Sequence, residues 1–160
     1  KRLRATAAVF LALVGIPLPS SAGEVVVGIA SVVDGDTIEL HGERIRLFGV
    51  DAPESRQFCE DASGQSYRCG QRAAFALADR INQKSIRCEG RTRDRYGRLV
   101  AICYLGDEDL DAWLVSQGLA LAFLEHGEDA IAAQPLHQAK AEAQGGRGLW
   151  AVGAGVVWRR

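Results

Sequence analysis

Five short segments rich in β-branched and apolar residues, with one amphipathic segment between the third and the fourth, constrain the fold of this chain more than any other feature. The segments that predict strands are residues 25–33, 37–40, 43–50, 85–89 and 99–105. Residues 71–83 predict a helix with one buried face, because their apolar side chains repeat at i, i+3, i+4 and i+7. The apolar side chains of that face are Ala74, Leu77, Ala78 and Ile81.

Two more helices are predicted after the fifth strand. The first contains Leu110 and Leu114 and ends at Gly118, and the second runs from Pro135 to Gly145. This order predicts an α+β, mainly β fold: a five-stranded OB-fold barrel with three helices. The pattern alone leaves a general α+β sandwich open. Hydrophobic residues make up 48% and charged residues 24%, a balance that excludes a disordered chain.

The first 22 residues have the pattern of a signal peptide. Lys1, Arg2 and Arg4 form a basic start, residues 5–18 are apolar, and residues 20–22 are small. A membrane anchor is the competing interpretation, but the apolar run is shorter than the ~20 residues that a bilayer requires. We therefore predict a cleaved leader at residues 1–22, one domain at residues 23–160, no membrane segment after cleavage, and a periplasmic or secreted protein.

Four cysteines follow the predicted leader, at positions 59, 69, 88 and 103. An even number of cysteines in an oxidising compartment favours disulfides, and four cysteines allow three full pairings. Proximity in the sequence favours Cys59–Cys69 and Cys88–Cys103. A zinc site is disfavoured because the spacings are wide and no Cys-x-x-Cys is present.

The charge balance argues against a protein that coats nucleic acid through bulk charge. The formal net charge is −1, and three of the 19 basic residues lie in the predicted leader. Any contact with a polyanion must therefore come from a local cluster. Five arginines gather around the turn between residues 85–89 and 99–105 and predict a polyanion groove: Arg87, Arg91, Arg93, Arg95 and Arg98.

Three segments carry the residues of a candidate active site: VVDGDTI at 32–38, IRLFGVDAPES at 45–55 and RDRYGRLVAICY at 93–104. Asp36 and Asp51 are hard oxygen donors that, with a carbonyl and waters, suit Ca²⁺. Glu54 follows Asp51 closely enough to deprotonate a metal-bound water. Arg46 and Arg98 carry planar guanidinium groups suited to phosphate oxygens. Together these groups predict phosphodiester hydrolysis.

With these motifs, and with LVSQGLA at 114–120, the chain resembles the thermonuclease family from about residue 24 to residue 150. The resemblance implies an OB-fold and Ca²⁺-dependent cleavage of DNA, RNA or both, with a preference for unpaired strands and with 3′-phosphate products. It also implies roles for individual residues. Asp36, Asp51 and the backbone carbonyl of Ala52 match the calcium ligands, and Asp34 matches a carboxylate that supports them. Glu54 matches the general base, Arg46 and Arg98 match the phosphate-binding arginines, and Arg95 and Tyr96 belong to the substrate-binding motif.

The sequence departs from the family pattern in two places. The family's lysine-rich loop after the glutamate is replaced by RQFCEDASGQSYRCG at residues 56–70. Two nucleotide-contacting tyrosines of the family are absent from residues 119–129, which read LALAFLEHGED. The reaction chemistry is therefore expected to be intact, while the surface that grips the bases differs.

Two functions of different classes remain at this point. The first is a calcium-dependent nuclease, and the second is a catalytically inactive OB-fold module that binds single-stranded nucleic acid or an envelope partner. The presence of all five residues Asp36, Arg46, Asp51, Glu54 and Arg98 favours the nuclease. A phosphodiesterase that acts on a non-nucleic substrate is a third alternative. No sequence feature predicts the oligomeric state.

Overall fold

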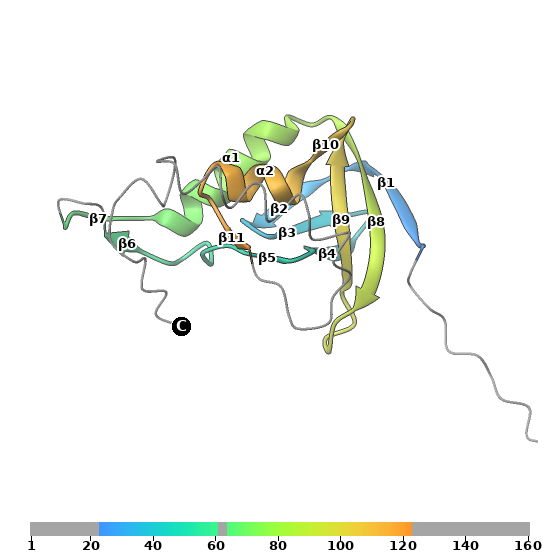
Figure 1. Cartoon of the computed structure of the whole chain (residues 1–160), viewed down its shortest axis with the longest axis horizontal. Helices are drawn as coiled ribbons and strands as arrows, with labels where there is room; N and C mark the ends of the chain where they lie inside the picture. The colour runs from blue at the N-terminus through green and yellow to red at the C-terminus, as the bar shows by residue number, and fades with distance from the viewer. Residues whose placement is uncertain (1–22, 61–63, 123–160) are drawn as a thin grey trace, which may run out of the picture.

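The computed structural model describes residues 23–60 and 64–122. Its main sheet has seven strands, and the path of six of them is β1–β8–β9–β4–β3–β2 (Figure 1). These strands are β1 (Val25–Ile29), β2 (Ser31–Asp34), β3 (Thr37–Leu40), β4 (Glu43–Leu47), β8 (Ser85–Arg93) and β9 (Leu99–Leu105). The short β10 (Glu108–Asp109) also pairs with β9. Strands β4 and β9 are parallel, and the other pairs are antiparallel.

The sheet curls because its first and last strands follow each other in the sequence. Only Ala30 separates β1 from β2, yet β1 pairs with β8 and β2 pairs with β3. The single strand predicted at residues 25–33 is therefore two strands, since a break at Ala30 lets each half hydrogen-bond to a different neighbour. The curled, mainly β sheet agrees with the predicted fold class.

Helix α1 (Cys69–Ile81) confirms the predicted helix but begins two residues earlier and ends two residues earlier. Its buried side includes Ala73, Ala74, Leu77 and Ile81. Helix α2 (Leu110–Ser116) confirms the next one, and the carboxylate of its N-cap Asp109 accepts hydrogen bonds from two backbone amides. The helix predicted from Pro135 lies outside the described residues. Among those that are described, no helix is long and apolar enough to cross a membrane.

Five two-residue strands, β10 among them, were not expected from the sequence. Strand β5 (Val50–Asp51) pairs with β11 (Leu121–Ala122), and β6 (Cys59–Glu60) pairs with β7 (Ser66–Tyr67). The predicted strand 43–50 ends at Leu47, because Gly49 adopts a positive φ of 65° and turns the chain. The described residues therefore contain eleven strands where five were predicted, together with two of the three predicted helices.

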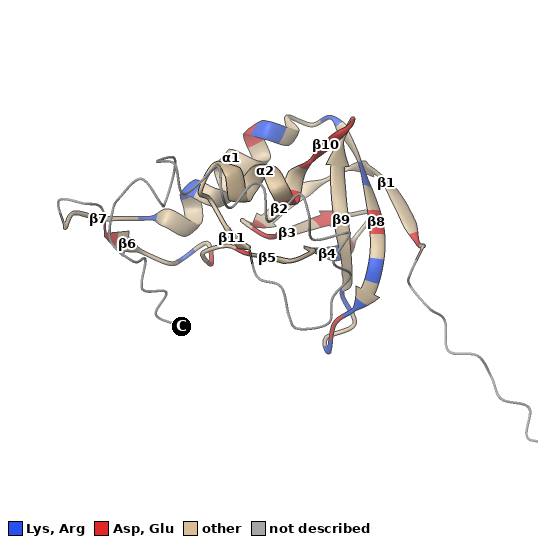
Figure 2. Ribbon diagram, in the orientation of Figure 1, with Lys and Arg blue, Asp and Glu red and all other residues tan. Residues whose placement is uncertain are grey.

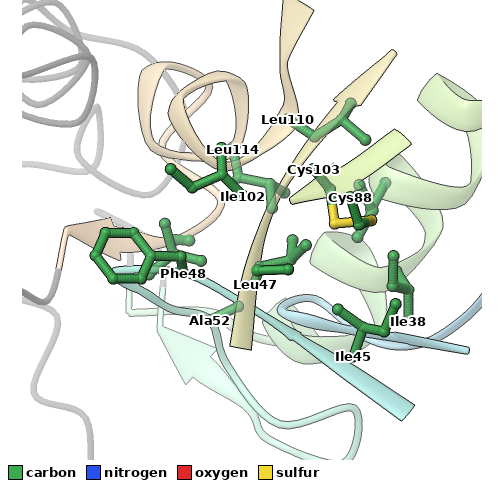
Figure 3. Close-up of a cluster of buried hydrophobic side chains, with 14 of the residues drawn as sticks. Ile38, Ile45, Leu47, Phe48, Ala52, Cys88, Ile102, Cys103, Leu110 and Leu114 are labelled. Carbon is green, nitrogen blue, oxygen red and sulfur yellow. A yellow bond between two sulfur atoms is a disulfide. The ribbon is translucent and has the colours of Figure 1, made fainter. Parts of the chain in front are cut away.

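The core lies between the curled sheet and the two helices. Figure 3 shows Leu47, Phe48, Leu110 and Leu114 pointing into it, together with the Cys88–Cys103 disulfide. Cys88 and Cys103 face each other across β8 and β9, and both are fully buried. The second disulfide joins Cys59 to Cys69 in a separate small cluster with Tyr67. Both predicted pairings are confirmed.

Asp111 of α2 is buried beside this core, with 1% of its surface exposed. One carboxyl oxygen, Oδ2, accepts a hydrogen bond of 3.2 Å from the Phe48 amide. The other, Oδ1, has no partner among the described residues. Burial raises the pKa of Asp111 well above its usual range. This side chain thus fixes the turn between β4 and β5 at the cost of a strongly desolvated carboxyl group.

Candidate active site

Asp36 lies in the turn between β2 and β3, and its carboxylate is held by three donors. It accepts hydrogen bonds from Thr37 Oγ1 at 3.0 Å, from Arg46 Nη1 at 3.0 Å and from the Ala52 amide at 3.2 Å. The preceding Gly35 permits this packing, because a Cβ there would lie 2.8 Å from the Cβ of Ala52. Only 6% of Asp36 is exposed, so its orientation is fixed by the fold.

The guanidinium group of Arg46 links two of the predicted metal ligands. Arg46 projects from β4, where it pairs with Thr37 of β3. Its Nη1 lies 3.0 Å from Asp36 Oδ2, and its Nη2 lies 3.5 Å from Asp51 Oδ1. Nη2 also donates to the Val50 carbonyl at 3.3 Å. Two carboxylates that are distant in sequence therefore converge on one cation.

Glu54 has a fixed backbone and an exposed side chain. Its amide donates to Gln57 Oε1 at 3.3 Å, and its carbonyl accepts from the Gln57 amide at 2.7 Å. Gly70, in the first turn of α1, packs closely against the same carbonyl group. A Cβ atom at Gly70 would lie 1.7 Å from the Glu54 carbonyl oxygen. The next residue, Ser55, donates from its amide to Asp34 Oδ1 at 3.1 Å and also contacts that oxygen through its hydroxyl. Asp34 therefore anchors the turn that carries Glu54.

The electrostatics of this region show an excess of negative charge. Partial desolvation is the largest effect on the pKa of Glu54 and raises it above its usual value. The nearby Asp34, Asp36 and Asp51 raise this pKa further, whereas Arg46 lowers it. Glu54 thus lies within electrostatic range of three other carboxylates and one arginine. The described residues contain no group of three or more acidic, His or Cys side chains arranged to hold a metal. Asp36, Asp51 and the Ala52 carbonyl would therefore need water molecules to complete a Ca²⁺ site.

The hairpin between β8 and β9 holds Arg98 in place through Asp94. Arg98 Nε donates to Asp94 Oδ2 at 2.7 Å, and the amides of Tyr96 and Arg98 donate to Asp94 Oδ1 at 2.9 and 3.0 Å. Burial would raise the pKa of Asp94, but these hydrogen bonds lower it below its usual value. The exposed Tyr96 ring lies against two guanidinium groups, 4.8 Å from that of Arg95 and 5.6 Å from that of Arg98.

The parallel pairing of β4 and β9 places Arg46 and Arg98 on one face of the sheet. Ile45 pairs with Leu99, and both are buried. Because side chains alternate along a strand, Arg46 and Arg98 both lie on the opposite face from this pair. In this register Arg98 stands opposite Arg44, so Arg46 lies two residues further along the neighbouring strand. That offset corresponds to roughly 8 Å between the Cα atoms of Arg46 and Arg98. Arg46 in β4 and Arg98 immediately before β9 therefore share one face of the sheet.

The arginine cluster predicted around the hairpin is largely engaged by carboxylates. Arg93 binds Glu43 at 2.7 Å and Glu24 at 3.1 Å, and Arg87 forms an ion pair with Glu89. Arg98 is bound by Asp94 at 2.7 Å. These pairs reduce the positive charge that the sequence alone indicates, and the polyanion groove stays a prediction.

Three supporting residues were missed from the sequence: Thr37, Ser55 and Asp94. Each hydrogen-bonds a predicted site residue, namely Asp36, Asp34 and Arg98 respectively. All three lie inside the motifs that carry the prediction. Their signal was a hydroxyl or carboxylate beside a functional residue, in a turn where local hydrogen bonding is common.

Comparison with known proteins matches residues 44–152 to the family described as staphylococcal nuclease homologue. Micrococcal nuclease of Shigella flexneri is 32% identical, over 92% of this chain and 84% of that protein. Thermonuclease of Staphylococcus intermedius is 34% identical, over 72% of this chain and 70% of its own length. Succinoglycan biosynthesis protein ExoI of Rhizobium meliloti is 47% identical over 64% of this chain, and the match spans about half (54%) of ExoI.

Proposed function

Since the chain belongs to the family of staphylococcal nuclease homologues, we propose that it is a Ca²⁺-dependent nuclease of DNA, RNA or both that prefers unpaired strands. The observation that carries this proposal is the convergence of Asp36 and Asp51 on the guanidinium group of Arg46. Related proteins named as nucleases support a nuclease function in general.

The donor set fits a hard divalent cation. Asp36 of the β2–β3 turn and Asp51 of β5 offer carboxylate oxygens, and Ala52, whose amide binds Asp36, offers a backbone carbonyl. The excess of carboxylates over arginines around Glu54 is a charge imbalance that a dication would offset. When bound, Ca²⁺ supplies positive charge to the phosphate oxygens as negative charge builds on them.

In this proposal the side chains have the roles that the family resemblance implies. Glu54 takes a proton from a water molecule, whose oxygen forms the new bond to phosphorus, and a raised pKa makes this carboxylate a better base. Arg46 and Arg98 donate hydrogen bonds to the phosphate oxygens. The bond from phosphorus to the 5′ oxygen breaks, the electron pair stays on that oxygen, and a proton comes from solvent. The products are a 3′-phosphate and a 5′-hydroxyl.

Export to the periplasm or the medium is the second part of the proposal. The leader predicted at residues 1–22 lies outside the described residues. Two disulfides that involve all four cysteines support an oxidising compartment. The expected mature protein is the domain at residues 23–160.

Incubation of the full chain with denatured DNA tests the nuclease, first with Ca²⁺ and then with excess calcium chelator. We expect cleavage with Ca²⁺, no cleavage with chelator, and products that carry 3′-phosphates. Equal activity in chelator would refute the metal. Binding without cleavage under any divalent ion would instead favour the inactive OB-fold module.

A second candidate is hydrolysis of a non-nucleic phosphodiester, which the similarity to ExoI favours. That protein's name places it in succinoglycan biosynthesis, and the match spans 54% of it. The two candidates differ in a competition assay on a chromogenic phosphodiester. A nuclease is inhibited by single-stranded oligonucleotides at low concentration, whereas an enzyme with another substrate is not.

A further inference from the structure

An exposed aromatic side chain lies close to the candidate general base. Phe58 follows Glu54 by four residues, and 57% of its surface is exposed. Four residues of fully extended chain span at most ~14 Å, and the Glu54–Gln57 turn shortens this distance. The guanidinium group of Arg68 lies 5.5 Å from the centroid of the Phe58 ring. In this Phe58–Arg68 pair, the guanidinium group covers part of the Phe58 ring, and the rest of the ring is open to solvent.

The Phe58–Arg68 pair is fixed to the backbone of the candidate active site. Cys59 and Cys69, the residues that follow Phe58 and Arg68, are joined by a disulfide with a Cα–Cα distance of 5.6 Å. The Gly70 amide donates to the Gln57 carbonyl at 3.3 Å, and Gly70 itself packs on the Glu54 carbonyl. Because the backbone on both sides of the pair is fixed, stacking a ligand on the ring orders little more than the Phe58 side chain.

The charges around the pair suit a polyanion. Arg56, Arg68 and Arg72 are all exposed, and none forms an ion pair with a described acidic side chain. In contrast, Arg93 and Arg98 of the β8–β9 hairpin are bound by carboxylates. Figure 2 shows basic residues both on that hairpin and between β7 and α1. The described arginines that form no ion pair with a described carboxylate thus include these three, together with Arg44 and Arg95.

We propose that the Phe58–Arg68 pair is a base-stacking subsite for the single strand whose phosphate lies at Glu54. The inference rests on the proposed nuclease function and names how its substrate is held. A nucleobase stacks on the open part of the Phe58 ring, and the arginines attract the phosphates on either side of it. Stacking on a ring face requires no particular base, so the subsite favours unpaired strands over duplexes without sequence preference.

The first test compares Phe58→Ala with Phe75→Ala in the full chain. Phe75 of α1 is a matched control, because 61% of it is exposed and no guanidinium group is described over its ring. Binding of a fluorescent single-stranded 12-mer is measured by anisotropy in Ca²⁺, with circular dichroism as a check of folding. We expect Phe58→Ala to weaken binding by roughly 5- to 150-fold and Phe75→Ala to have no effect. Equal effects of the two variants would overturn the proposal.

The second test removes single bases from the oligonucleotide. An abasic site at one position should weaken binding to the wild type and have no further effect on Phe58→Ala, because both changes remove the same contact. Additive effects at every position would overturn the proposal. Arg68→Gln should reduce the slope of log affinity against log salt by about one. Binding that depends on Phe58 without cleavage would support the subsite and refute the nuclease, whereas cleavage without this coupling would do the reverse.

Discussion

Removing the buried disulfide should cost this chain a large part of its stability. In Cys88→Ala/Cys103→Ala, the unfolded chain regains the entropy of a loop with a sequence separation of 15, worth about 3 kcal/mol at 25 °C. Each substitution also removes one fully buried heavy atom, a change comparable to Ile→Val at about 0.5–1.5 kcal/mol. The expected total is about 4–6 kcal/mol, against the 5–15 kcal/mol that is typical of whole domains.

The second disulfide supplies the matched control. For Cys59→Ala/Cys69→Ala the sequence separation is 10, and the same relation gives about 2.7 kcal/mol. The two loop terms are nearly equal, so a difference between the variants measures the packing around the sulfurs. Cys88 and Cys103 lie in the main core, whereas Cys59 and Cys69 contact Tyr67 in a small separate cluster.

Urea unfolding followed by circular dichroism, with linear extrapolation to water, measures both free energies of unfolding. We expect the core variant to lose more free energy of unfolding than the loop variant. Cys59 and Cys69 are also buried, at 8% and 1% exposure, but they pack in a small cluster with Tyr67 rather than in the main core. If the loop variant lost as much as the core variant, packing around Cys88 and Cys103 would not contribute and the reasoning would fail.

Three further predictions concern single side chains. Glu54→Gln should lower kcat by roughly 10²–10⁴-fold in a denatured-DNA assay and leave the thermal unfolding temperature unchanged, because the side chain is exposed; full activity would exclude it as the base. Arg98→Lys should lower kcat by roughly 10²-fold, because an ammonium cannot bind Asp94 and reach a phosphate as a planar guanidinium can; wild-type turnover would refute this role. Asp111 has a raised pKa in the folded state, so its contribution to stability is fully present below about pH 3.9 and is lost as the pH rises through the folded pKa. In urea titrations at several pH values, Asp111→Asn should therefore become more stable relative to wild type as the pH rises, and a constant difference would contradict the assignment.

The sequence predicted strands and helices well where side-chain periodicity matches burial. Residues 99–105 were predicted as a strand and form β9, and the apolar face of α1 is the buried one. The break at Ala30 was not predictable, because β-branched residues stand on both sides of it and Val25, Val27 and Ile29 are exposed although apolar. The two-residue strands β5 and β11 were also not predicted, because two residues are too few to show a periodic pattern of apolar side chains.

The candidate site was predictable in its membership but not in its geometry. The motifs named Asp36, Arg46 and Asp51, but the bridging of both carboxylates by Arg46 depends on the β3–β4 hairpin and on β5. The position of Arg98 depends on the parallel pairing of β4 with β9, which local sequence does not encode. The Phe58–Arg68 contact depends on the hairpin of β6 and β7.

The pairing of Asp51 with Leu121 has a consequence for when activity can arise. Strand β5 carries a predicted metal ligand early in the sequence, but its partner β11 is synthesised only near the end of the described residues. A nascent chain therefore holds every candidate site residue before the strand that pairs with one of them, Asp51, has been synthesised. If the protein is exported unfolded, as the predicted leader implies, the nucleic acids of the producing cell meet only a chain in which β5 and β11 have not yet paired.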